Sequence, residues 1–326
     1  MLESELQGKR ILVTGAAGFI GSRLVQALLE QGANIIACIN PGEESRLSRI
    51  CTSGSLRVIS CSLANAKALA YWKETFRDVE LVAHLWLHVP PAADFYVNAA
   101  KDVTTNILGT FNLLSILGPS LQGISFASSV QVYGRHHVPV KEDFCPNPLS
   151  SYAVTKLALE GYLRAYSQER DVPVTILRYA TVYGPGEKSH RAIPNFLHSL
   201  AQGKAPTIFG NGSEVRDYVN VDDVVAATIQ SLKKNQSGVL NIGSGEGRTT
   251  LEVAGKLMQL SGINLEPRFI TRSESNINIV CDIALAREML GYEPQTSLSE
   301  GLVREIEWFE REVLGRPLNQ LTKRGF

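Results

Sequence analysis

The chain has 326 residues, of which 44% are hydrophobic and 20% charged, and its 32 basic and 32 acidic side chains give a formal net charge of zero. This length and composition can bury a substantial core and suggest about two domains. The balanced charge provides no electrostatic footprint for nucleic acid or an anionic membrane, so we expect neither as a partner. No apolar run approaches the length of a membrane helix and no signal-peptide pattern opens the sequence, so we expect a cytoplasmic protein.

Short apolar runs alternate with amphipathic stretches along the chain, which favours a parallel sheet covered by helices on both faces. The sequence predicts strands at 10–14, 34–39, 56–60, 80–84, 123–128, 174–179 and 238–242. Helices are expected at 18–31, 98–117, 150–170, 191–202, 222–233, 249–261, 283–290 and 298–314. The last helix begins with a capping-box pattern, Ser297 followed by Glu300. Its buried stripe is expected to consist of Leu302, Ile306, Phe309 and Val313.

A glycine-rich turn joins the first predicted strand to the first predicted helix. It reads Thr14-Gly15-Ala16-Ala17-Gly18-Phe19-Ile20-Gly21. Its three glycines allow a tight turn and let backbone N–H groups approach a pyrophosphate at the positive end of the helix dipole. A turn without a ligand would not need to bridge a buried strand and an amphipathic helix. We therefore predict that a dinucleotide binds at Gly15, Gly18, Phe19, Ile20 and Gly21.

A tyrosine and a lysine lie one turn apart in the predicted helix 150–170, in the sequence Ser151-Tyr152-Ala153-Val154-Thr155-Lys156. An i,i+4 pair projects from one helix face, so the ammonium of Lys156 can lie close to the phenol of Tyr152. A nearby positive charge lowers a tyrosine pKa and suits the phenol to proton exchange with a substrate hydroxyl. This spacing alone is weak, because most such pairs carry no chemistry. Together with the glycine turn it indicates a hydride-transfer enzyme.

Several motifs follow one another in the order of a known family. TGxxGFIG at 14–21, with GxxGxxG spacing, precedes Ser128-Ser129-Val130-Gln131-Val132-Tyr133-Gly134 and then YxxxK. Further matching blocks lie at 177–179, 182–186, 208–212, 215–219, 241–245 and 290–294. This ordered set resembles the extended short-chain dehydrogenase/reductase family, specifically its nucleotide-sugar epimerase/dehydratase branch.

The resemblance implies a doubly wound α/β fold with a parallel Rossmann sheet and a smaller C-terminal α/β substrate domain. We expect the cofactor domain at 1–180, with the strand near 238–242 returning to its sheet, and a mostly substrate-binding domain at 181–326. Related enzymes pair the helices near 98–117 and 150–170 across a two-fold axis, so we expect a homodimer. The five cysteines lack CxxC spacing, which predicts reduced thiols and no metal site.

The resemblance also implies catalytic roles. Tyr152 would be the acid/base that exchanges a proton with a sugar hydroxyl, and Lys156 would tune it. Ser129 would hydrogen-bond the reacting oxygen, with Ser128 as its nearby competitor. Asn106 matches a family position near the active-site helices, where a structural role is expected.

At two positions this chain departs from the family pattern, and both departures reduce the number of reactions expected of it. Dehydratases and decarboxylases of this branch carry an acidic residue in one or both positions after the catalytic Ser or Thr. Val130 and Gln131 stand there in this chain, and neither side chain exchanges a proton, so 4,6-dehydration is disfavoured.

The choice of cofactor depends on the end of the second strand. An acidic residue there binds the adenosine ribose and favours NAD over NADP, but this chain has Ile39-Asn40. We expect Asn40, together with Tyr152 and Lys156, in the cofactor site and either NAD or NADP as cofactor, with NAD slightly preferred. Arg46 and Arg49 follow and would serve a 2′-phosphate or form a solvated helix face.

Three residues are expected to bind a nucleotide-sugar substrate besides Ser129. Arg216 matches the arginine that contacts the nucleotide diphosphate, and its alternative is an ion pair with Asp217 or Asp222. Thr181 stands where many relatives place an Asn that touches the sugar nucleotide. Phe209 would stack on a base or pack in a strand.

These features favour a sugar-nucleotide 4-epimerase. An NADPH-dependent keto-sugar reductase is the second hypothesis, and a catalytically silent dinucleotide sensor or scaffold is the third. The presence of Ser129, Tyr152 and Lys156 together argues against a silent protein.

Overall fold

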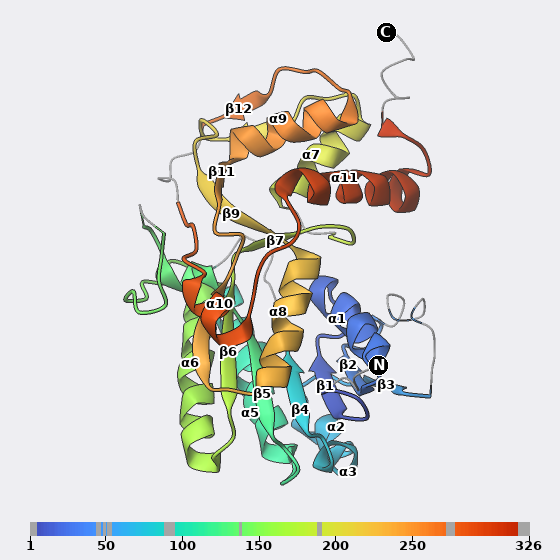
Figure 1. Ribbon diagram of the computed structural model, residues 1–326, viewed down its shortest axis with the longest axis vertical. Coiled ribbons are helices and arrows are strands. Elements are labelled where there is room, and N and C mark those ends of the chain that lie inside the picture. The colour runs from blue at the N-terminus through green and yellow to red at the C-terminus, as the bar shows by residue number, and fades with distance from the viewer. Residues whose placement is uncertain are drawn as a thin grey trace.

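The computed structural model describes residues 5–43, 47, 50, 54–87, 95–136, 139–187, 191–271 and 278–318. Its central feature is a seven-stranded sheet with the strand order β10-β6-β5-β4-β1-β2-β3, in which every neighbouring pair is parallel (Figure 1). The strands are β1 (Arg10–Thr14), β2 (Asn34–Ile39), β3 (Leu56–Ser60), β4 (Leu81–His84), β5 (Gly123–Ser129), β6 (Val174–Tyr179) and β10 (Gly238–Ile242). All seven predicted strands are confirmed to within one residue at either end, and the sheet is parallel and doubly wound, as predicted.

Helices cover both faces of this sheet, which explains why β4, β5 and β6 in its middle are buried at every position. Ile11 and Val13 of β1 pack on one face against α1 and α8, whereas Leu12 packs on the other. The first face carries α1 (Phe19–Glu30), α8 (Val221–Lys234) and α10 (Ala284–Leu290). The second face carries α2 (Ala66–Ala70), α3 (Lys73–Arg77), α5 (Leu108–Ile116) and α6 (Ser151–Arg170).

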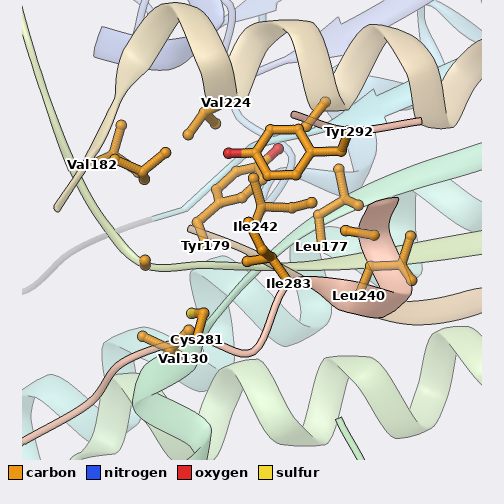
Figure 2. Close-up of a cluster of buried hydrophobic side chains, with 14 of the residues drawn as sticks. Val130, Leu177, Tyr179, Val182, Val224, Leu240, Ile242, Cys281, Ile283 and Tyr292 are labelled. Atoms are coloured by element: carbon orange, nitrogen blue, oxygen red, sulfur yellow. The ribbon is translucent and has the colours of Figure 1, made fainter. Parts of the chain in front are cut away.

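A hydrophobic cluster ties the C-terminal part of the chain to the large sheet (Figure 2). Tyr179 at the end of β6 and Ile242 at the end of β10 pack there with Val224 of α8 and with Tyr292. The hydroxyl of Tyr292 donates to the carbonyl oxygen of Gly243 at 2.7 Å. The segment after α10 is therefore anchored beside the carboxyl ends of β6 and β10.

The remaining strands form two small sheets. One has the order β11-β9-β7, and β8 pairs with β12 in the other. Their bounds are β7 (Thr181–Tyr183), β8 (Thr207–Phe209), β9 (Val215–Asn220), β11 (Gly247–Thr249) and β12 (Arg268–Ile270). They accompany a separate hydrophobic cluster built on α7 (Ala192–Ala201), α9 (Thr250–Ser261) and α11 (Leu298–Phe309), which lies above the large sheet in Figure 1. The sequence prediction missed these five strands because most span three residues, too few for a period to show.

Two expected helices contain π-helical turns. The predicted helix 98–117 is α4 (Phe95–Asp102), a π-helical turn (Val103–Ile107) and α5. The predicted helix 298–314 is α11, capped by Ser297 and Glu300 as expected, followed by a π-helical turn (Glu310–Leu314). A π turn takes one more residue than an α turn and rotates the side chains that follow it. The prediction that Val313 joins the buried stripe is therefore wrong, since Val313 is 43% exposed.

A buried chain of hydrogen bonds links β1, β4 and α5. Thr14 Oγ1 accepts the Trp86 backbone N–H at 3.1 Å and lies 2.8 Å from His84 Nδ1. His84 Nε2 lies 2.9 Å from Thr110 Oγ1, and that hydroxyl donates to the carbonyl oxygen of Asn106 at 2.7 Å. The Asn106 side chain in turn donates to Asp102 Oδ1 at 3.3 Å. Asn106 is thus buried in a structural network, in line with its expected role.

The described cysteines Cys38, Cys61, Cys145 and Cys281 are free thiols, and all but Cys145 are buried. Within the described ranges, no cluster of His, Cys, Asp and Glu could hold a metal ion. None of the helices described is both long and apolar enough to cross a membrane.

Candidate active site

A cavity of about 1290 Å³ lies at the carboxyl ends of β1, β5 and β6. Its other walls come from α7, β8 and β9. The large sheet and the part of the molecule built on α7, α9 and α11 therefore both contribute to the cavity. In doubly wound sheets this edge is where ligands bind. A typical pocket for one small ligand holds roughly 300–1,000 Å³, so the cavity has room for more than one bound group.

The glycine turn forms one wall of the cavity. Gly15 has φ +66°, and a Cβ added there would lie 2.9 Å from the carbonyl oxygen of Leu85. A Cβ on Gly21 would lie 2.2 Å from the carbonyl oxygen of Gly15, so the turn and α1 pack too closely for any side chain. Gly15, Gly18, Phe19, Ile20 and Gly21 all line the cavity.

The start of α1 suits an anion. Its N-cap, Gly18, makes no side-chain hydrogen bond, and the first turn contains no acidic residue. The N–H groups of that turn and the positive helix end therefore meet no competing carboxylate from the helix itself. These residues fit the pyrophosphate of a dinucleotide. Asn40 does not itself line the cavity, but the next residues of its loop, Gly42 and Glu43, do.

Tyr152 and Ser129 face each other in the cavity wall. Ser129 ends β5, and Tyr152 lies in the first turn of α6, where the hydroxyl of Ser150 caps the helix by accepting the Ala153 N–H at 3.2 Å. Burial raises the pKa of the half-buried Tyr152, whereas a hydrogen bond with Ser129 and the positive charge of Arg191 lower it. The net direction is upward, opposite to the lowering expected from the sequence.

The contacts of Lys156 hold its ammonium away from the role of lowering the pKa of Tyr152. Its side chain is buried, its Nζ donates to the carbonyl oxygen of Ala127, and it lies 4.7 Å above the ring of Phe126. Burial lowers the pKa of Lys156 to about 7, and the nearby Glu160 opposes that shift. The i,i+4 spacing puts both residues on one helix face as predicted. In this structure, however, the cation that lowers the pKa of Tyr152 is Arg191.

The two adjacent serines have different partners. Ser128 Oγ donates to Glu160 Oε1 at 2.5 Å, and Glu160 forms a buried ion pair with Arg178 at 2.7 Å. Ser129 Oγ accepts the backbone N–H of Gln131 at 3.2 Å and bonds with Tyr152. Ser128 therefore supports a buried structural pair, and Ser129 is the serine beside the phenol.

Arg216 has a different partner from the two that the sequence suggested. Its Nη2 lies 2.7 Å from Oε1 of Glu214, the residue that directly precedes β9. Asp217 instead accepts hydrogen bonds from the loop after β10, and Asp222 pairs with Arg23 at 2.6 Å. The alternative of an ion pair with Asp217 or Asp222 is therefore wrong.

The structure gathers the other substrate candidates around the same cavity. Thr181, Phe209 and Arg216 line it from β7, β8 and β9 respectively. Phe209 is 60% exposed, which leaves its ring free for stacking rather than packed in a core. Gln131 and Val130 also line the cavity, and Val130 is at the same time buried in the hydrophobic cluster shown in Figure 2.

Sequence reasoning missed four charged residues of the cavity wall: Glu43, Glu187, Arg191 and Glu214. Arg191 directly precedes α7, and its Nη1 lies 3.8 Å from Glu187 Oε1. Neither residue has a regular spacing to any of the recognised motifs, so no pattern could reveal them. Glu43 follows Asn40-Pro41-Gly42, a turn signal that was available in the sequence. Arg46 and Arg49 lie outside the described residues.

Comparison with known proteins agrees with this geometry. The sequence profile described as "NAD dependent epimerase/dehydratase family" matches residues 11–243. The UDP-glucuronic acid 4-epimerase of Bacillus cereus, solved with UDP-glucuronic acid and NAD, has a TM-score of 0.85 and 32% identity, over 93% of this chain and 99% of that chain.

Two curated relatives have similar coverage. UDP-glucose 4-epimerase of Mycolicibacterium smegmatis is 32% identical over 315 residues, which are 93% of this chain and 99% of that protein. UDP-glucuronate 4-epimerase of Thermodesulfobacterium geofontis is 29% identical over 313 residues, which are 93% of this chain and 96% of that protein. These similarities confirm the predicted fold and enzyme class, and the chain belongs to the NAD-dependent epimerase/dehydratase family.

Proposed function

We propose that this protein is an NAD-dependent 4-epimerase of a UDP-linked sugar. The observation that carries the proposal is the single cavity that contains both the uncapped start of α1 and the group Ser129, Tyr152 and Lys156. The chain is similar to epimerases that were solved with UDP-sugars, one of them also with NAD. This similarity supports the same substrate class and cofactor for this protein.

The residues of the cavity suit reversible oxidation of one sugar carbon. A dinucleotide held by the glycine turn would supply the acceptor and later the donor of a hydride for that carbon. Tyr152, as phenolate, takes the proton of the hydroxyl on the same carbon, so that a carbonyl forms. Ser129 donates a hydrogen bond to the reacting oxygen and holds it near the phenol. Tyr152 then returns the proton to the oxygen of that carbonyl, and return of the hydride to the opposite face of the carbonyl carbon would give the inverted centre.

Arg191 and Lys156 have different roles around Tyr152. The positive charge of Arg191 lowers the pKa of Tyr152 and so favours the phenolate, against the burial that raises it. Lys156 donates to the carbonyl oxygen of Ala127 and so ties the start of α6 to the end of β5. Burial brings the pKa of Lys156 to about 7, so its charge changes near neutral pH.

The wall next to Ser129 argues against dehydration. Gln131 faces the cavity, and its amide accepts and donates hydrogen bonds but does not exchange protons. Val130 is buried and apolar. We therefore expect no 4-keto-6-deoxy product from a nucleoside-diphosphate hexose.

We further propose that residues 1–180, with β10, hold the cofactor and that most of 181–326 holds the substrate. Thr181, Phe209 and Arg216 are the proposed substrate contacts from that second part. Free cysteines fit a reducing compartment, so we place the enzyme in the cytoplasm.

A homodimer is proposed from one apolar surface. Val103 and Leu108, at the π turn and the start of α5, are 47% and 46% exposed, and Val154 and Tyr162 of α6 are 51% and 49% exposed. Apolar side chains gathered on neighbouring helices favour burial against a partner. Light scattering at micromolar concentration should give twice the chain mass of 35.6 kDa, and a monomer mass would contradict the proposal.

The function is tested by incubating the purified protein with UDP-glucose and, separately, with UDP-glucuronic acid, and following the sugar by NMR. An epimerase converts at least one of them to its 4-epimer without net consumption of cofactor. Net oxidation of NADPH with a keto sugar would instead indicate a reductase. Absence of turnover with every nucleotide sugar, despite dinucleotide binding, would indicate a silent sensor.

A further inference from the structure

The loop after β2 is a tight turn with a defined conformation. β2 ends at Ile39, and the backbone N–H of Glu43 donates to the carbonyl oxygen of Asn40 at 3.2 Å. Pro41 occupies the second position of this four-residue turn, and Gly42, with φ +91°, occupies the third. A turn with proline second and a positive φ third is of type II, and glycine is favoured at that third position. The sequence Asn-Pro-Gly-Glu thus reverses the chain at the carboxyl end of β2.

This reversal brings a carboxylate back to the strand end. Asn40 Nδ2 donates to Glu43 Oε1 at 3.3 Å. Both Gly42 and Glu43 line the cavity that also contains Gly15 and Gly18. Within the described chain, Asn40 is the side chain that hydrogen-bonds the Glu43 carboxylate, which leaves its second oxygen for a ligand.

The position is the one where a doubly wound fold holds the adenosine ribose. In such folds an acidic residue at the end of the second strand accepts the ribose hydroxyls, while the glycine turn holds the pyrophosphate. Ile39 and Asn40 supply no carboxylate at the strand end itself. The turn supplies one three residues after Asn40, on the wall of the same cavity.

We propose that Glu43 is the carboxylate that binds the adenosine ribose hydroxyls and that excludes a 2′-phosphate, so that it sets the preference for NAD over NADP. This inference rests on the dinucleotide binding contained in the proposed function. A carboxylate accepts hydrogen bonds from two neighbouring hydroxyls, and its charge repels a phosphate placed at the same site. Asn40 is then a positioning residue, because it holds the Glu43 side chain against the strand end.

The test measures dissociation constants of NAD and NADP by isothermal titration calorimetry for the wild-type protein and for Glu43→Gln. Loss of a hydrogen bond to a charged group corresponds to about 10-fold or more in affinity. We expect Glu43→Gln to bind NAD about 10-fold more weakly and NADP several-fold more tightly. Asn40→Ala should shift both constants in the same directions by a smaller factor.

The matched control is Glu30→Gln, which also replaces a glutamate by glutamine. Glu30 ends α1 at the end away from the glycine turn, and its Oε1 accepts a hydrogen bond from Gln26 Nε2 at 2.7 Å. Both dissociation constants should stay within about twofold of wild type in this variant. As a second readout, nucleotides released from the denatured proteins should show a higher NADP share in Glu43→Gln than in the control.

Unchanged constants in Glu43→Gln would overturn the inference, as would an effect of Asn40→Ala without an effect of Glu43→Gln, because Asn40 would then contact the ribose directly. A wild-type protein that binds NAD through Glu43 but converts no nucleotide sugar would leave the inference standing and refute the proposed function. A wild-type protein that binds neither dinucleotide would refute both.

Discussion

The two ends of the cavity are built in different ways. Ser129 and Lys156, at the catalytic end, are 6% and 2% exposed and come from the end of β5 and the first turns of α6. At the other end Phe209 is 60% exposed and the Arg216 side chain 31%, on strands of three and six residues. Proton transfer requires fixed distances of about 3 Å, whereas recognition of a nucleotide tolerates adjustable side chains. The difference supports the proposal that the chemistry lies on the large sheet and the recognition of substrate on the small ones.

The largest effect is expected from the catalytic end, in Tyr152→Phe. The change removes the exchangeable proton and should lower turnover by about 10² to 10⁴. Tyr162→Phe on the same helix is the control, because Tyr162 is 49% exposed and should tolerate the change. Both variants should bind NAD and unfold as the wild type does. A Tyr152→Phe enzyme with more than about a tenth of wild-type turnover would show that another group is the acid/base.

The two adjacent serines sharpen the comparison, because only one of them faces the phenol. Ser129→Ala should lower turnover by roughly 10², as loss of one hydrogen-bond donor to a reacting oxygen does, with little change in the free energy of unfolding. Ser128→Ala should instead destabilise the fold by about 1–3 kcal/mol, because Glu160 loses a buried donor. Steady-state kinetics and chemical denaturation of both variants measure the two quantities. Interchanged results would assign the catalytic role to Ser128.

The end of the cavity that contains Phe209 and Arg216 is tested by Arg216→Ala. If Arg216 binds the diphosphate, its loss should cost about 1.5–3 kcal/mol, or roughly 10- to 150-fold in kcat/KM, mostly through KM. Arg248→Ala is the matched control, since Arg248 lies directly opposite Arg216 on β11 and pairs with Glu246. An unchanged KM in Arg216→Ala would point to a smaller substrate without a nucleotide.

The smallest effect concerns the buried lysine. Because burial lowers the pKa of Lys156 to about 7, the folded protein binds fewer protons than the unfolded chain between about pH 7 and 10.5. The contribution of Lys156 to the free energy of unfolding therefore rises with pH in that window, by at most about 1.4 kcal/mol per pH unit. Guanidinium unfolding at pH 7 and pH 9 should show a smaller rise in Lys156→Met than in wild type. Lys234→Met, at the exposed end of α8, should behave as wild type, and identical pH dependence in Lys156→Met would refute the shift.

The sequence was sufficient for the large sheet because short runs rich in apolar residues alternate with amphipathic stretches along the chain. It was also sufficient for the family, since the glycine turn and the Tyr152–Lys156 pair stand at fixed spacings. The small sheets escaped prediction because pairing between distant segments, not local periodicity, makes strands of three residues. Contacts such as Lys156 to Ala127, Arg216 to Glu214 and Arg191 near Tyr152 depend on how side chains fill the folded cavity. No spacing in the chain encodes those contacts.

The buried hydrogen bonds around His84 fix both the position of its ring and its protonation state. The hydroxyl of Thr110 donates to the carbonyl oxygen of Asn106, so the oxygen of that hydroxyl accepts the N–H of His84 Nε2. The hydroxyl of Thr14 then donates to His84 Nδ1. Only the neutral Nε2–H tautomer satisfies both neighbours, and burial lowers the pKa of His84 to about 3. The imidazole is therefore insensitive to acidification over the whole range in which the cell functions. Its bond to Thr14 holds the neutral ring next to the glycine turn, and His84 contributes no change of charge near neutral pH.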